Sequence, residues 1–138
     1  MRNDALCRDY LDRSAARLKA LQVLLQERSW ADVVREAQEI VELSLKALVR
    51  SAWIEVPRLH DVSPVLEQNR DRFPEAVRAR LDELIEISRH LRRDRELAFY
   101  GSEDLTPTEF YKREDAVTAA DQAARVHGCV AEALAESQ

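Results

Sequence analysis

Apolar and small residues recur at steps of three and four along most of the chain, which predicts long amphipathic helices. The repeat predicts a first helix over residues 4–26, with Asp4 as its N-cap, and a second over residues 30–52 that Ser29 can cap. Additional apolar residues widen the second helix's face, so we expect it to be central and to touch several neighbours. The two apolar seams read Cys7, Leu11, Ser14, Leu18, Leu21 and Leu25, and then Trp30, Val34, Ala37, Val41, Leu45, Leu48 and Ala52.

Further along the chain, Pro57 ends the second pattern, and a short helix over residues 64–69 is expected after a cap at Asp61 or Ser63. A fourth helix is predicted over residues 74–99, an ordered loop over 100–111 with Gly101 ending the helix, and a last helix over 114–135. The fourth seam reads Val77, Leu81, Leu84, Ser88, Leu91, Arg95 and Ala98, and the last one Ala116, Ala119, Ala123, Val126, Val130 and Ala133.

These elements predict one all-α domain over residues 1–138, an up-and-down antiparallel bundle of four long helices and one short helix. Only two glycines and four prolines are present, which argues against folds that need many tight turns. The alanine-rich last seam allows close helix approach, either inside the bundle or across a dimer interface.

The net charge of -5 argues against a general nucleic-acid coat protein, although a local basic patch can still exist. Cys7 and Cys129 are far apart in sequence and fit neither a disulfide framework nor a metal site, so we expect two buried thiols. No stretch resembles a signal peptide or a membrane span. We therefore expect a cytoplasmic protein that does not associate with membranes.

Familiar catalytic motifs are absent from the sequence. Two isolated glycines cannot build a P-loop or a dinucleotide-binding loop, and the three histidines show no zinc-ligand spacing. A helical di-metal site would need Glu-x-x-His pairs, and none is present. Helical ion pairs such as Glu42–Lys46 account for most of the acidic residues. We therefore expect no metal and no cofactor.

One segment, residues 89–96, places four arginines within seven positions near the end of the fourth helix. Cations are favoured there by the helix dipole, which is one explanation of the cluster. The other is an anion site, because guanidinium groups bind phosphate oxygens in pairs. Arg95 lies on the apolar seam, where a buried arginine needs Glu42, Glu96 or a ligand as its partner. Tyr100, one turn further, could stack on a base or cap the core.

At four places the sequence resembles the HEPN family of helical domains. The second helix carries Ala37-Gln38, Val41-Glu42 and Leu45-Lys46-Ala47-Leu48, followed by His60-Asp61-Val62 in a turn. Residues 91–101 resemble the family's arginine-to-tyrosine segment, and residues 111–116 resemble the start of its final helix. The likeness extends over about residues 10–130, and the ordered set is more specific than any single piece.

The resemblance implies a helical bundle, commonly a homodimer, that binds nucleotides or RNA. Many relatives act with a minimal nucleotidyltransferase in toxin–antitoxin-like pairs, and several are metal-independent ribonucleases with an Arg-x4-6-His motif. Here no histidine follows the arginines at that spacing, and without an imidazole general acid–base cleavage of RNA loses its main participant. The residues expected to bind a nucleotide or another anion are Arg92, Arg95, Arg89, Tyr100, Lys46 and His60.

Three hypotheses follow. The leading one is a non-catalytic HEPN module that binds a nucleotide, RNA or a nucleotidyltransferase partner. The second is a ribonuclease toxin in which a displaced histidine, His60 or His90, replaces the missing one. The third is a structural dimeric adaptor with no nucleotide ligand.

Overall fold

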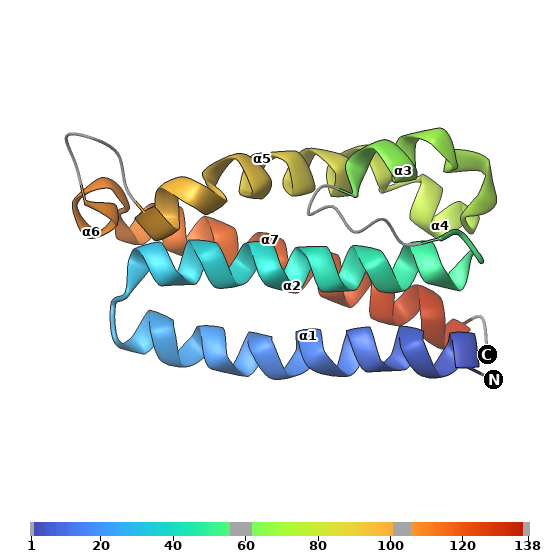
Figure 1. Ribbon diagram of the computed structural model, residues 1–138, viewed down its shortest axis with the longest axis horizontal. Coiled ribbons are helices and arrows are strands. Elements are labelled where there is room, and N and C mark those ends of the chain that lie inside the picture. Colours follow the sequence, from blue (N-terminus) through green and yellow to red (C-terminus); the bar gives the residue numbers. More distant parts are fainter. Residues whose placement is uncertain (1, 56–61, 101–105, 137–138) are drawn as a thin grey trace.

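The computed structural model describes the backbone of residues 2–55, 62–100 and 106–136. It describes the side chains of residues 3–55, 62–93 and 106–136. Four long helices form most of it. They are α1 (Arg2–Gln26), α2 (Trp30–Ser51), α5 (Leu81–Tyr100) and α7 (Arg113–Glu136) (Figure 1). The described residues contain no strand, so the predicted all-α bundle is confirmed. None of the described helices is long and apolar enough to cross a membrane.

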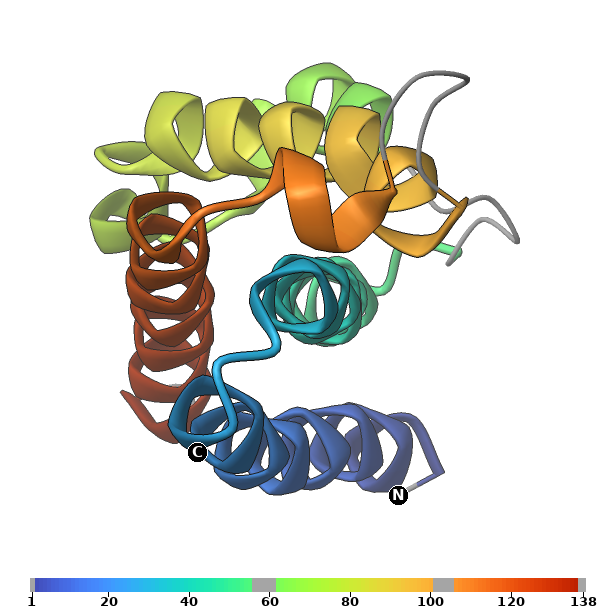
Figure 2. The same ribbon diagram turned by 90° about the vertical axis from the view of Figure 1, so that its left-hand side faces the viewer.

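Helix α2 lies at the centre and contacts α1, α5 and α7, as its broad apolar face predicts (Figure 2). Its seam from Val34 to Leu48 is buried, and Ile40 and Leu45 are fully inaccessible to solvent. Each of the other long helices has one apolar face, which it buries mainly against α2 or a neighbour of α2. The Arg17 guanidinium also reaches Glu36 at 2.9 Å and ties α1 to α2.

The short elements differ from the prediction in two places. The helix expected over residues 74–99 is divided into α4 (Glu75–Arg78) and α5, because the Arg80 N–H turns back to the Val77 carbonyl, three residues earlier, at 3.0 Å. Neither glycine nor proline marks this break. The expected loop before residue 111 contains α6 (Pro107–Phe110), which begins at Thr106, whose hydroxyl accepts the Glu109 N–H at 3.3 Å.

Apart from the divided fourth helix, the predicted helix starts are correct to within two residues, but the expected caps are not all used. Helix α1 begins at Arg2, so Asp4 lies in its first turn rather than at the N-cap. Ser29 is the N-cap of α2, yet its hydroxyl donates to the Asp32 carboxylate at 2.6 Å instead of capping the backbone. Helix α3 (Ser63–Gln68) begins at Ser63, after Val62, and a 3-10 turn, η1 (Arg70–Arg72), follows it. The positions of Asp61 and Gly101 lie outside the described residues.

The small and apolar seams of α1, of α7 and of α5 as far as Leu91 face the core as predicted, whereas the side chains of Arg95 and Ala98 lie outside the described set. Ser14 and Leu21 are fully buried, Ser88 is 6% exposed, and Ala116, Ala123 and Val130 are fully buried. Both cysteines are buried and free. Burial raises the pKa of each thiol, which keeps them protonated and consistent with the prediction of small buried hydrophobes.

Helix α2 ends in a turn that normally contains glycine. The Trp53 N–H donates to the Arg50 carbonyl at 2.9 Å and the Ile54 N–H to the Val49 carbonyl at 3.3 Å, the bonding pattern of a Schellman motif. Trp53 occupies the left-handed position with φ of 61°, where a Cβ is unfavourable, and its side chain is 68% exposed. This tryptophan therefore strains the backbone without filling the core.

We predict that Trp53→Gly will be more stable than Trp53→Ala by about 1 kcal/mol, the reverse of the usual order within helices. Both changes remove the exposed indole, so their difference isolates the left-handed backbone. Urea unfolding followed by circular dichroism measures the two free energies of unfolding. An alanine variant as stable as the glycine variant would show that position 53 carries no such strain.

Candidate functional site

The exposed part of the basic segment on α5 consists of Arg92 and Arg93. Both side chains are exposed, and no acidic side chain in the described part of the chain pairs with either. Between them and the core, Leu91 is fully buried and holds this turn of α5 against the bundle. Two guanidinium groups thus project into solvent from consecutive positions of α5. Arg93 is an addition to the predicted set, and its only sequence signal is its place beside Arg92.

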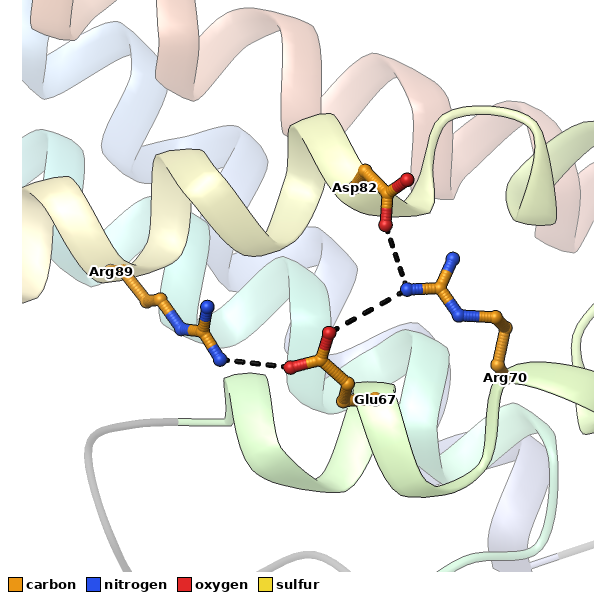
Figure 3. Close-up of polar contacts among 4 residues, drawn as sticks. All are labelled: Glu67, Arg70, Asp82 and Arg89. Carbon is orange, nitrogen blue, oxygen red and sulfur yellow. Dashed lines mark hydrogen bonds and ion pairs between the residues drawn. The ribbon is translucent and has the colours of Figure 1, made fainter.

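Arg89, by contrast, has a protein partner. Its guanidinium lies 2.8 Å from the Glu67 carboxylate on α3 (Figure 3). Glu67 also lies 3.7 Å from Arg70, whose guanidinium reaches Asp82 at the start of α5 at 2.7 Å. These exposed pairs link α3 and the following turn to α5. Arg89 therefore contributes to the packing of this face, and a ligand would have to compete with Glu67 for it.

Lys46 is likewise engaged inside the bundle. Its ammonium lies 2.7 Å from Glu42 Oε1, which confirms the predicted ion pair. Glu42 is only 7% exposed, and its other oxygen accepts a long hydrogen bond of 3.4 Å from Gln38 Nε2. The three side chains follow one face of α2 at steps of four, and this row neutralises a buried carboxylate.

Three predicted site residues fall outside what the structure describes. Arg95 and Tyr100 belong to α5, but their side chains are outside the described set, and His60 lies in a segment that is not described. Their predicted roles stay predictions from the sequence. Arg95 follows Arg92 by three residues along α5.

The described histidines are held within the bundle. His127 on α7 is half-buried, and its Nδ1 lies 2.6 Å from the hydroxyl of Ser14 on α1, which also donates to the Leu11 carbonyl at 3.0 Å. Burial lowers the pKa of His127, so the ring is neutral at pH 7. His90 on α5 is also half-buried. Within the described residues, no three His, Cys, Asp or Glu side chains come together in a way that could hold a metal.

Because its pKa is lowered, His127 should make the free energy of unfolding depend on pH. The unfolded chain binds a proton at this ring near pH 6.5, whereas the folded protein binds it only at lower pH, so stability falls as the pH drops below about 6.5. We expect the free energy of unfolding in urea to decrease between pH 7.5 and 5.5. In His127→Gln, which keeps a polar partner for Ser14, the decrease should be smaller. An equal decrease in both proteins would contradict this assignment.

A family model for the HEPN domain matches residues 7–134, nearly the whole chain. The chain therefore belongs to the HEPN family, as its second-helix and α5 motifs predict. No curated protein and no solved structure showed significant similarity to it. Family membership supports a nucleotide- or RNA-related module, and the exposed arginines of α5 lie within the matched region.

Proposed function

We propose that this chain is a non-catalytic HEPN module that binds phosphate groups of a nucleotide or RNA on the C-terminal half of α5. The observation that carries the proposal is that Arg92 and Arg93 are exposed and have no acidic partner in the described structure. We call Arg92 and Arg93 the α5 arginine surface, and we propose from the sequence that Arg95 adds to it. A planar guanidinium offers paired N–H donors that match phosphate oxygens.

The ion pairs of Arg89 and Lys46 support the choice of Arg92 and Arg93 as the phosphate-binding residues. Arg89 and Lys46 each have a carboxylate within 2.8 Å, so binding a phosphate there would mean breaking an existing pair. Arg92 and Arg93 lose only water when they bind an anion. We propose that Tyr100 and His60 add to the same surface, with Tyr100 stacking on a base, as their positions in the sequence near the arginine cluster suggest.

The placement of His127 argues against its use as the base of RNA cleavage. A general base must reach the RNA 2′-hydroxyl within hydrogen-bond distance. His127 is neutral but is bonded to Ser14 between α1 and α7, and it comes from a different helix than the arginines. His90 and His60 are the remaining histidines that a ribonuclease mechanism could use.

We predict that the double variant Arg92→Ala/Arg93→Ala binds a fluorescein-labelled single-stranded RNA at least tenfold more weakly than the parent. Fluorescence anisotropy between 50 and 200 mM salt should also give a smaller salt dependence, because each lost phosphate contact removes about 0.7 from the slope of log K against log salt. Arg95→Ala should weaken binding by over tenfold while the fold survives.

The matched control is Arg13→Ala on α1, an exposed arginine that lies 3.7 Å from Asp9 and should leave binding unchanged. Equal affinities for the parent and the double variant would overturn the proposal. The same RNA incubated with the protein and EDTA should stay intact. Cleavage that disappears in His90→Gln or His60→Gln would favour the ribonuclease hypothesis instead.

We further propose, from the family resemblance, that the module forms a homodimer and acts with a minimal nucleotidyltransferase in a toxin–antitoxin-like pair. A neighbouring gene for a small nucleotidyltransferase would support the pair, and co-expression should then give a complex that copurifies. Light scattering of the pure chain is expected to give twice the 15.9 kDa mass. A monomer at all concentrations, or two proteins that separate on a sizing column, would count against these parts alone.

A further inference from the structure

A surface cavity of about 400 Å³ lies where α1 ends and where α2 and α7 begin. Figure 2 looks onto this end of the bundle, where the connection from α1 to α2 is in the foreground. The volume falls within the range of small-molecule sites. We call it the Trp30 pocket, and its lining consists of Leu25, Gln26, Arg28, Trp30, Arg113 and Val117.

The charges in the Trp30 pocket are all positive. Arg28 and Arg113 line it, no acidic residue does, and neither arginine forms an ion pair with an acid in the described part of the chain. Two nearby acids are already engaged. Asp32 accepts the Ser29 hydroxyl at 2.6 Å, and Asp115 accepts the Lys112 N–H at 2.9 Å. The lining of the pocket therefore suits an anion.

The rest of the lining is largely apolar and includes an aromatic ring. Trp30 and Leu25 are partly buried against the core, while Val117 is 40% exposed. Trp30 and Arg28 also border an adjoining cavity of about 220 Å³. An indole beside two guanidinium groups is suited to a flat aromatic ligand that carries a negative group.

Arg28 occupies a backbone position where glycine would be more favourable. Its φ is 59°, its N–H donates to the Leu25 carbonyl at 3.1 Å, and the Ser29 N–H donates to the Leu24 carbonyl at 3.0 Å. This is the Schellman turn that ends α1, and glycine is the usual residue at its left-handed position. The arginine side chain thus lies at the pocket despite a local strain, a situation that is common at functional sites.

We propose that the Trp30 pocket binds a nucleotide, with its phosphate held between Arg28 and Arg113 and its base against Trp30. None of these residues belongs to the α5 arginine surface, so this site goes beyond the proposed function and stands separately from it. The α5 arginine surface is exposed on a single helix, whereas the Trp30 pocket is a cavity lined by residues at the ends of three helices. A single nucleotide matches the volume of the pocket, and its base matches Trp30, whereas the sugar–phosphate backbone of a nucleic acid would leave the indole without a partner.

The test uses the fluorescence of Trp30. The chain has two tryptophans, so Trp53→Gly leaves Trp30 as the single tryptophan, which is excited selectively at wavelengths that tyrosine does not absorb. In this protein, adenosine 5′-monophosphate should quench the emission in a saturable manner. Adenosine, which lacks the phosphate, and inorganic phosphate, which lacks the base, should each bind at least tenfold more weakly. Absence of quenching at millimolar nucleotide would overturn the proposal.

Two substitutions in the Trp53→Gly background locate the binding. Arg28→Gly and Arg113→Gln should each raise the dissociation constant for the nucleotide about tenfold. Because glycine relieves the left-handed strain at position 28, Arg28→Gly should keep or raise the unfolding midpoint, so weaker binding cannot be attributed to unfolding. The control is Arg125→Gln, an exposed arginine of α7 that pairs with Glu83 at 2.9 Å. Unchanged affinity in both pocket variants would overturn the assignment.

The α5 arginine surface is tested separately in the same assay. Arg92→Ala/Arg93→Ala should leave the quenching of Trp30 by the nucleotide unchanged, even where it abolishes RNA binding. If the nucleotide affinity falls in that variant and not in Arg28→Gly, the ligand binds at α5 and the pocket proposal is wrong. Failure of RNA binding with normal quenching would instead overturn only the proposed function.

Discussion

Burial of α2 against α1, α5 and α7 is the interaction on which this fold depends. Each flanking helix has a single apolar face, and a separate helix of this length is marginal in water. Complete burial of one leucine or isoleucine contributes roughly 1.5–3 kcal/mol, and Ile40, Leu45 and Leu48 are all essentially inaccessible. The position of every surface discussed above, including the exposed turn of α5, follows from how its helix packs on this central one.

Residue periodicity was enough to predict the long helices, because it reflects the burial that stabilises them. The predicted bounds of α2 and α7 differ from the observed ones by at most one residue at each end. The break at Ala79 and Arg80 had no proline or glycine to reveal it, and α6 is a single turn whose Thr106 cap and Pro107 resemble an ordinary loop sequence. Local hydrogen bonding, rather than the hydrophobic pattern, decides such short elements.

The candidate site was less predictable, because it depends on which charges find partners. The arginine cluster on α5 is evident in the sequence. Its division into a paired Arg89 and an exposed Arg92 is not, because the partner of Arg89 is Glu67 on α3, 22 residues earlier in the chain. The Trp30 pocket is built from residues on three helices that no sequence motif connects.

Ion pairing and capping also explain how a protein of net charge -5 can present positive surfaces. Its acids are partly engaged with its own arginines and helix ends, so the local charge can differ in sign from the total.

The direction of the helices separates the two ends of the molecule. Helix α1 begins and α7 ends at one end of the bundle, whereas α5 ends and the Trp30 pocket opens at the other (Figure 1). The 22 residues of α2 between these ends correspond to about 33 Å. A protein fused beside the start of α1 or the end of α7, or a linker that tethers the chain there to a sensor surface, would therefore be attached about one helix length from the Trp30 pocket and would leave it open to solution.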